Sequence, residues 1–173
     1  TLSQRHGLAA PFHRRRAQLG ELFLPEARRW RLSIVTPWVS AKVSASTPIA
    51  HDGAPDAAAL KRELINAMTS RAHKLTALTC QDVTAQRLGG HLAHHVAEQL
   101  LPSALHVVQA DLQSCLLPAD SAGNGHRFAM LAWVGQAELS VHGEALPWLS
   151  LLNLCGGGAQ SDKGFGAVDL TPV

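Results

Sequence analysis

The order of strand-like and helix-like segments after residue 30 is the feature of this sequence that most constrains its fold. Residues 31–39 (RLSIVTPWV) are rich in β-branched side chains, which is typical of a strand, and Pro37 predicts a turn. Residues 56–78 place Asp56 at an N-cap position before apolar residues at helical spacing, which predicts a helix. The same patterns predict the remaining elements: a loop over 40–55, a helix from Thr84 or Ala85 to Leu101 that ends at Pro102, a strand over 105–117, a turn over 120–125, a strand over 127–141 that is either continuous or bulged at Gly135, a helix over 144–154 and a strand over 165–170.

These elements follow one another as β, α, α, β, β, α, β. If the second helix is treated as an insertion, the order is close to βαββαβ, the ferredoxin-like arrangement. We therefore expect an α+β fold with an RRM-like antiparallel sheet, helices on one face and the other face free. Two regions are expected: residues 1–30 as a basic N-terminal arm, and residues 31–173 as the folded domain.

Arginines are concentrated at the start of the chain. Residues 1–31 contain seven arginines and two glutamates, a net charge of +5, whereas the remaining residues carry a net charge of −3. A basic segment on a slightly acidic body indicates a polyanionic partner that is bound mainly by that segment. A solvated arm that keeps the protein in solution explains the charge equally well.

Cysteine spacing and hydropathy narrow the class of protein. Cys80, Cys115 and Cys155 form no CxxC pair, so neither a thiolate zinc site nor a disulfide framework is expected. Free thiols in a reducing cytoplasm are the simplest account. The sequence has no apolar run long enough to span a membrane and no visible secretory signal, so we expect a cytoplasmic protein without a membrane partner.

The segment 156–166 (GGGAQSDKGFG) has five glycines in eleven residues and lies between an expected helix and an expected strand. Glycine permits positive φ and close approach of a ligand, so successive N–H groups could face phosphate oxygens while Lys163 adds charge. Phe165 could stack on a base or anchor the loop in the core. The order of elements excludes a Walker loop and a dinucleotide fingerprint. A flexible connection is the alternative.

Residues 127–168 then resemble a known family. The segments VGQA (134–137), LPWL (146–149) and GFG (164–166) are similar to the C-terminal signature of the CRISPR repeat-processing endoribonucleases of the RAMP superfamily. Upstream, LSIVTP (32–37) and SRAHKL (70–75) resemble a strand and a helix of that family. The resemblance covers about residues 31–173. Members usually have two ferredoxin-like halves, and this chain matches the second, so the resemblance leaves residues 1–30 as either a basic arm or a remnant of the first half.

The resemblance implies metal-independent cleavage of a repeat RNA by the ribose 2′-hydroxyl, without a cofactor. That chemistry needs a base, an acid and cations near the phosphate. The catalytic candidates are His6, His13 and Arg16. The residues predicted to bind RNA are Arg5, Arg14, Arg15, Arg71, Lys74, Gly157, Gly158, Gln160, Ser161, Lys163, Gly164 and Phe165.

Two other functions stay open. One is a non-catalytic RAMP-type subunit that binds guide RNA together with other CRISPR effector subunits. The other is a metal-dependent enzyme that uses His91 and His95, which share a helix face but lack a signalled third ligand. Two further residues are minor candidates: His73, expected near the core, and Trp38, expected in the core or at its edge but also the tryptophan that could stack on a base.

Overall fold

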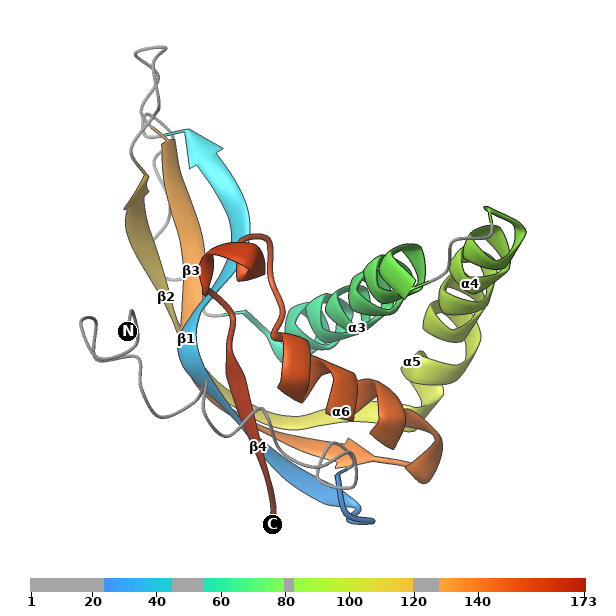
Figure 1. Cartoon of the computed structure of the whole chain (residues 1–173). Coiled ribbons are helices and arrows are strands. Elements are labelled where there is room, and N and C mark those ends of the chain that lie inside the picture. Colours follow the sequence, from blue (N-terminus) through green and yellow to red (C-terminus); the bar gives the residue numbers. More distant parts are fainter. Residues whose placement is uncertain (1–23, 45–54, 80–82, 120–127) are drawn as a thin grey trace, which may run out of the picture.

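The computed structural model describes residues 24–44, 55–79, 83–119 and 128–173 (Figure 1). The elements are β1 (Arg29–Ser44), α3 (Ala57–Thr79), α4 (Val83–His95), a π-helical turn (Val96–Leu100), α5 (Leu101–Ala104), β2 (Leu105–Ala119), β3 (Phe128–Val141), α6 (Leu146–Cys155) and β4 (Val168–Pro172). None of the described helices is long and apolar enough to cross a membrane. The expected turn over 120–125 and most of the arm, residues 1–23, lie outside the described residues.

The four described strands form one antiparallel sheet in the order β2-β3-β1-β4. This is the strand order of the ferredoxin-like arrangement, so the predicted α+β fold and antiparallel sheet are confirmed. Figure 1 shows α3 and α6 on the same side of the sheet, and α4 against α3 rather than on the sheet. The expected helical insertion is therefore α4 with its continuation into α5.

The two faces of the sheet follow from the alternation of side chains along each strand. Trp30 and Leu32 of β1 are fully buried, as is Leu139 of β3, and all three belong to the core under the helices. Arg31, between the two buried residues of β1, is exposed and pairs in register with Glu138. Burial of each large apolar side chain contributes about 1.5–3 kcal/mol, so a one-residue shift of register would be strongly unfavourable.

Helix α3 begins where the sequence predicts. A carboxylate oxygen of Asp56 accepts a hydrogen bond from the backbone N–H of Ala59 at 2.6 Å, which is N-cap geometry. Leu60, Leu64 and Met68 lie four residues apart and are almost completely buried. The capping residue therefore fixes the start of this helix, and the apolar stripe fixes the face that packs on the core.

The expectation that Pro102 ends the second helix is wrong. The chain continues from α4 through the π-helical turn into α5, with Pro102 in the first turn of α5. Proline costs little there, because the N–H groups of a first turn have no partner within their helix. The N–H of Leu101 reaches back five residues to Val96 O, and this wider turn brings Leu101 into the core.

The expected turn at Pro37 and the loop expected from Ser40 are also wrong in part, because β1 continues to Ser44. The pairing of β1 with β3 is irregular between Ile34 and Trp38. Residues 35–37 of β1 lie there opposite Val134 alone. Proline is tolerated at such an irregularity because the interrupted pairing needs no backbone N–H hydrogen bond from this position.

The bulge expected at Gly135 therefore forms opposite this residue, on β1. Gly135 itself has a φ of +125°, and a Cβ atom there would lie 2.3 Å from the carbonyl oxygen of Asp111. Glycine is thus required at this point of β3 because β2 approaches closely. The last strand also begins later than expected, at Val168 rather than Phe165.

Candidate nucleic-acid interface

The glycine-rich loop, residues 156–166, starts at the end of α6 and lies over Trp38 of β1. Gly156 has a φ of +65° and its N–H donates to Leu152 O at 2.8 Å, which closes the helix. A Cβ atom on Gly157 would lie 2.1 Å from the indole ring of Trp38. Glycine at 157 is therefore a packing requirement, because any side chain would collide with a fully buried ring.

Hydrogen bonds tie the loop to the irregular segment of β1. Ala159 N–H donates to Val39 O at 2.8 Å, and Gly166 N–H donates to Pro37 O at 2.9 Å. Thr36 adds two bonds: its hydroxyl donates to Gly164 O at 3.0 Å and accepts from Ala167 N–H at 2.9 Å. The bulge thus releases backbone groups of β1 from β3 and makes them available to the loop.

We expected successive backbone N–H groups of the loop to face phosphate oxygens, but several of these groups are already hydrogen-bonded within the protein. The N–H of Gly157 donates to Gly166 O at 2.8 Å, and those of Ala159, Lys163 and Gly166 also have acceptors within the protein. These four donors do not face solvent as a row. We infer that the loop presents side chains to a ligand more than it presents these backbone groups.

Arg71 connects α3 to the loop. Its Nε donates to Gly156 O at 3.1 Å, and its Nη2 donates to Gly158 O at 3.4 Å and to the hydroxyl of Ser161. The side chain is half-buried. The predicted contact of Arg71 with RNA stays a prediction; what the structure shows is a guanidinium that holds the loop against the helix.

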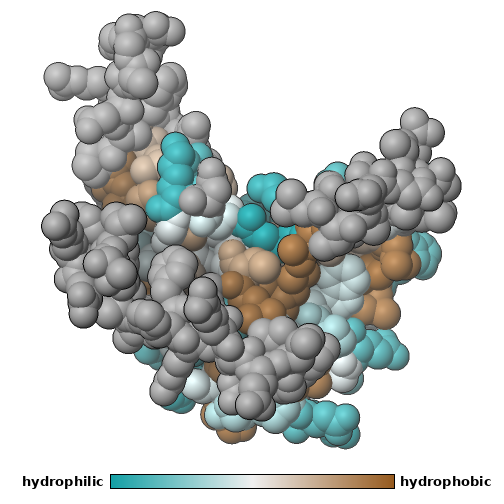
Figure 2. All heavy atoms as spheres, viewed as in Figure 1, coloured by the Kyte–Doolittle hydropathy of each residue, from teal (hydrophilic) through white to brown (hydrophobic). Residues whose placement is uncertain are grey.

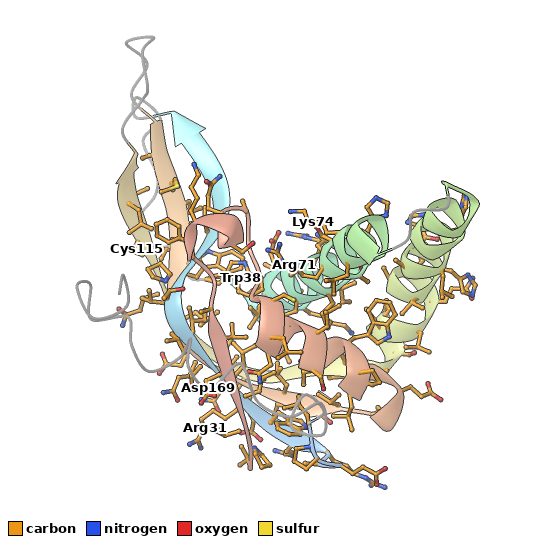
Figure 3. The ribbon with its side chains drawn as sticks, viewed as in Figure 1. Arg31, Trp38, Arg71, Lys74, Cys115 and Asp169 are labelled. Carbon is orange, nitrogen blue, oxygen red and sulfur yellow. The ribbon has the colours of Figure 1, made fainter. Side chains whose placement is uncertain are left out.

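Two exposed lysines lie near this connection. Lys74 follows Arg71 by three residues on α3, and Lys163 closes the short 3₁₀ turn Ser161–Lys163 of the loop. Figure 3 shows Arg71 and Lys74 on the side of α3 that is turned to the loop. In Figure 2, hydrophilic residues (teal) lie near the middle of the view, where the surface is hollowed between the upper part of the sheet and the helices on the right. These cations are the part of the predicted site that the described structure brings together.

The other predicted loop residues differ in exposure. Gly164 is exposed and has open space around it, and its φ of +88° lets it end the 3₁₀ turn in the left-handed conformation. Gly157 is buried, whereas Gly158 is half-buried. Gln160, Ser161 and Phe165 are half-buried, so each has part of its side chain within reach of a ligand.

Trp38 lies in the core, as expected, and its complete burial under the loop excludes the base stacking that was considered as its alternative role. Its indole Nε1 has no hydrogen-bond partner among the described residues. His73, expected near the core, is exposed instead, and its ring packs over Gly90 of α4. The sequence did not reveal that Gly157, which is far away in the chain, is the residue that covers the ring.

The N-terminal candidates lie outside the described residues; they are the catalytic candidates His6, His13 and Arg16 and the predicted RNA contacts Arg5, Arg14 and Arg15. The histidines of α4 can be placed. His91 and His95 are exposed, and His94 lies 3.2 Å from the carboxylate of Glu98. Within the described ranges, no three His, Cys, Asp or Glu side chains gather in a way that could hold a metal ion.

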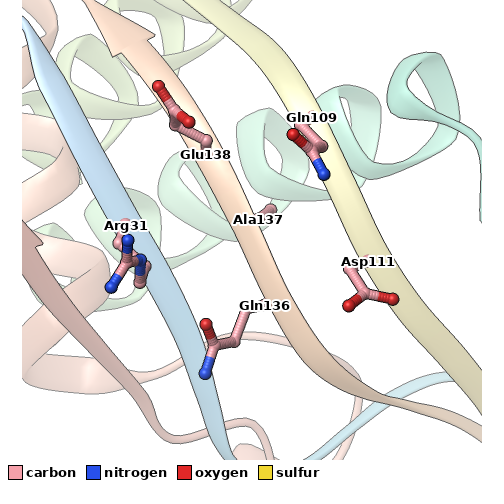
Figure 4. Close-up of a pocket in the computed structure, with 6 residues that line it drawn as sticks. All are labelled: Arg31, Gln109, Asp111, Gln136, Ala137 and Glu138. Atoms are coloured by element: carbon pink, nitrogen blue, oxygen red, sulfur yellow. The ribbon is translucent and has the colours of Figure 1, made fainter. Parts of the chain in front are cut away.

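The open face of the sheet carries a second polar hollow, of about 190 Å³ (Figure 4). It is lined by Arg31, Gln109, Asp111, Gln136, Ala137 and Glu138. Glu138 also accepts a hydrogen bond from Arg29 at 2.5 Å. Charges of both signs are therefore mixed here, and the lining includes no aromatic ring on which a base could stack. Sequence reasoning missed this hollow, although the alternation along the strands could have indicated it.

Comparison with known proteins gives structural matches only. No protein-family model matches the sequence, and no curated protein matches it. The fold resembles CRISPR endoribonucleases. A Cas6 product complex matches with a TM-score of 0.48 and 18% identity over 90% of this chain and 56% of that chain. A second Cas6 product complex matches with a TM-score of 0.47 and 18% identity over the same shares of the two chains.

A Cse3 CRISPR endoribonuclease bound to a 19-nucleotide RNA matches less closely. Its TM-score is 0.32 and its identity 12%, over 86% of this chain and 57% of that chain. The chain therefore spans little more than half the length of the solved structures that it matches.

Proposed function

We propose that this chain binds RNA through the surface formed by the glycine-rich loop and the adjoining end of α3. The observation that carries the proposal is the Arg71 connection, which holds the loop that carries Lys163 against α3, the helix that carries Lys74. Lysine and arginine side chains supply most of the affinity of proteins for nucleic-acid backbones. Gln160 and Ser161 add hydrogen-bonding groups, and Phe165 adds an aromatic ring.

We further propose that the protein is a CRISPR-associated endoribonuclease that binds a repeat RNA hairpin and cuts it without a metal ion. The support is the sequence signature over residues 127–168. A base removes the proton of the ribose 2′-hydroxyl, and the 2′-oxygen bonds to the adjacent phosphorus. The bond from phosphorus to the 5′-oxygen breaks while an acid protonates that oxygen. One product then ends in a cyclic phosphate.

The proposed division of labour follows the chain. Residues 31–173 hold the RNA, and the basic arm supplies the catalytic groups, with His6 and His13 as base and acid and Arg16 stabilising the charge on the phosphorane. The described loop and α3 contribute cations and hydrogen-bond donors to the same RNA.

The test is incubation of the purified protein with its cognate repeat RNA in EDTA. We expect one cut and a 2′,3′-cyclic phosphate at the new end. A repeat RNA with a 2′-deoxyribose at the cut position is the control, and it should bind equally well but stay intact. If the unmodified RNA binds and also stays intact, the cleavage proposal is refuted and the RNA-binding proposal stands.

A second candidate is a non-catalytic RAMP-type subunit that holds guide RNA in an effector complex. It is favoured by the composition of the described site, whose cations and donors suit holding RNA. Single changes of His6, His13 and Arg16 separate the two functions. A large fall in cutting rate with little change in affinity supports the endoribonuclease, whereas a fall in affinity alone supports the holding subunit.

A further inference from the structure

Helix α3 carries an exposed ridge that leads to the glycine-rich loop. Arg62, Asn66, Ser70 and Lys74 follow one another at intervals of four residues, and all four side chains are exposed. Four-residue spacing places them in one row on the surface of the helix. The row spans twelve residues, which is about 18 Å at 1.5 Å per residue.

The ridge is positive and rich in hydrogen-bond donors. It has two cations, an amide and a hydroxyl, and the acidic residue of this stretch, Glu63, is half-buried to one side. In the part of the chain that the structure describes, no carboxylate lies within ion-pair distance of Arg62 or Lys74. Among the described residues, neither cation therefore has an acidic partner that an external anion would have to displace.

The neighbouring cations of α3 are used differently. Lys61 donates to the carbonyl oxygen of Pro102 at 2.6 Å, which joins α3 to α5. Arg71 donates to the loop. The helix therefore separates its cations into two sets: one holds the fold together, and the other, Arg62 and Lys74, is exposed on the ridge.

The ridge ends beside the loop. Lys74 is its last member and lies on the loop side of α3 (Figure 3), while Lys163 stands exposed on the loop itself. An extended polyanion on the loop can therefore continue along α3 without meeting an exposed acidic side chain of the ridge.

We propose that this ridge binds the phosphates of RNA, so that the RNA backbone lies along α3 from Lys163 and Lys74 to Arg62. The inference rests on the proposed RNA binding and adds a direction and three further residues to it. Arg62 and Lys74 neutralise phosphates, while Asn66 and Ser70 donate hydrogen bonds to phosphate oxygens. Recognition of this kind is independent of base sequence.

The experiment measures RNA affinity at several salt concentrations for the wild type and for Arg62→Ala. Each phosphate contact contributes about 0.7 to 0.9 to the slope of log affinity against log salt concentration. Arg62→Ala should lower the slope by that amount and weaken unrelated RNAs equally. Arg31→Ala is the matched control, because it removes another exposed arginine, one that lies on the open sheet face. Its slope should equal that of the wild type.

Two further measurements keep the outcomes distinct. Arg62→Lys should restore the slope, and thermal unfolding of every variant should match that of the wild type. If the wild type does not bind RNA, the proposed function fails. If the wild type binds but Arg62→Ala keeps the full slope, or Arg31→Ala loses as much as Arg62→Ala, the ridge proposal alone is overturned.

Discussion

The surface formed by the glycine-rich loop and the adjoining end of α3, here called the loop side, differs from the open sheet face in how its charged residues are paired. On the loop side, Lys74 and Lys163 are exposed beside the connection made by Arg71. On the open face, Arg29 is bonded to Glu138, and Arg31 shares its hollow with acidic residues. The difference teaches that a cation suits a polyanion best when it has no acidic partner, and among the described ion pairs this holds for Lys74 and Lys163 but not for Arg29.

The largest expected effect comes from the packing of the loop on β1. Gly157→Ala should lower the free energy of unfolding by about 1–3 kcal/mol, because the new methyl group collides with the ring of Trp38. Chemical denaturation measures the loss. Gly143→Ala is the control, since no atom lies near its added methyl and its φ is not positive, and it should change stability by less than about 0.5 kcal/mol. Equal stability of the two variants would show that the loop is not packed on Trp38.

Arg71→Ala should have the next largest effect. It removes the donors to Gly156 O, Gly158 O and Ser161, so we expect a loss of about 1–2 kcal/mol in stability and weaker RNA binding. Arg71→Lys should not restore either property, because a single ammonium cannot reach all three acceptors of the planar guanidinium. Denaturation and an RNA titration on the same preparation measure both. Full recovery with lysine would contradict a role in holding the loop.

Lys163→Ala should separate binding from stability. The side chain is exposed at the end of the 3₁₀ turn, so unfolding should be unchanged while RNA affinity falls about threefold at moderate salt. Fluorescence anisotropy with a labelled RNA measures the affinity. The same titration of Arg31→Ala provides the comparison with the open face, where no change is expected. A larger loss for Arg31 than for Lys163 would reverse the assignment of the two surfaces.

The smallest effect is expected on the open face. Glu138→Gln removes the ion pair with Arg29, in which the arginine side chain is 56% exposed, so stability should change by less than about 1 kcal/mol. RNA affinity should stay within twofold of the wild type, although a cation has been released. A strong gain in affinity would show that the open face also takes part in binding RNA.

The features that sequence reasoning predicted correctly are local ones. The order of elements and the start of α3 at Asp56 depend on periodicity and on contacts within one turn, which the residue pattern records directly. Pro102 was misinterpreted because its cost depends on whether it falls in a first turn, and the pattern does not reveal the preceding π-helical turn.

The features that sequence reasoning could not predict depend on segments far apart in the chain. Thr36 and Pro37 form hydrogen bonds with a segment about 130 residues later in the chain. Because of these bonds, the residues expected to form a turn form a bulge within β1 instead. Arg71 was predicted to contact RNA, which stays a prediction, whereas its partners in the loop were not predicted. Arg62, Asn66 and Ser70 were not among the predicted RNA contacts, although their helical spacing alone could have indicated the row.

The burial of Trp38 beneath Gly157 has a practical consequence for spectroscopy. An indole in a dry, tightly packed environment emits at shorter wavelength than one in contact with water, and its Nε1 here has no partner among the described residues. Displacement of the loop would admit water to that nitrogen and shift the emission to the red. Trp38 is one of four tryptophans in the chain, so a red shift during an RNA titration reports loop movement if it disappears in a Trp38→Phe variant.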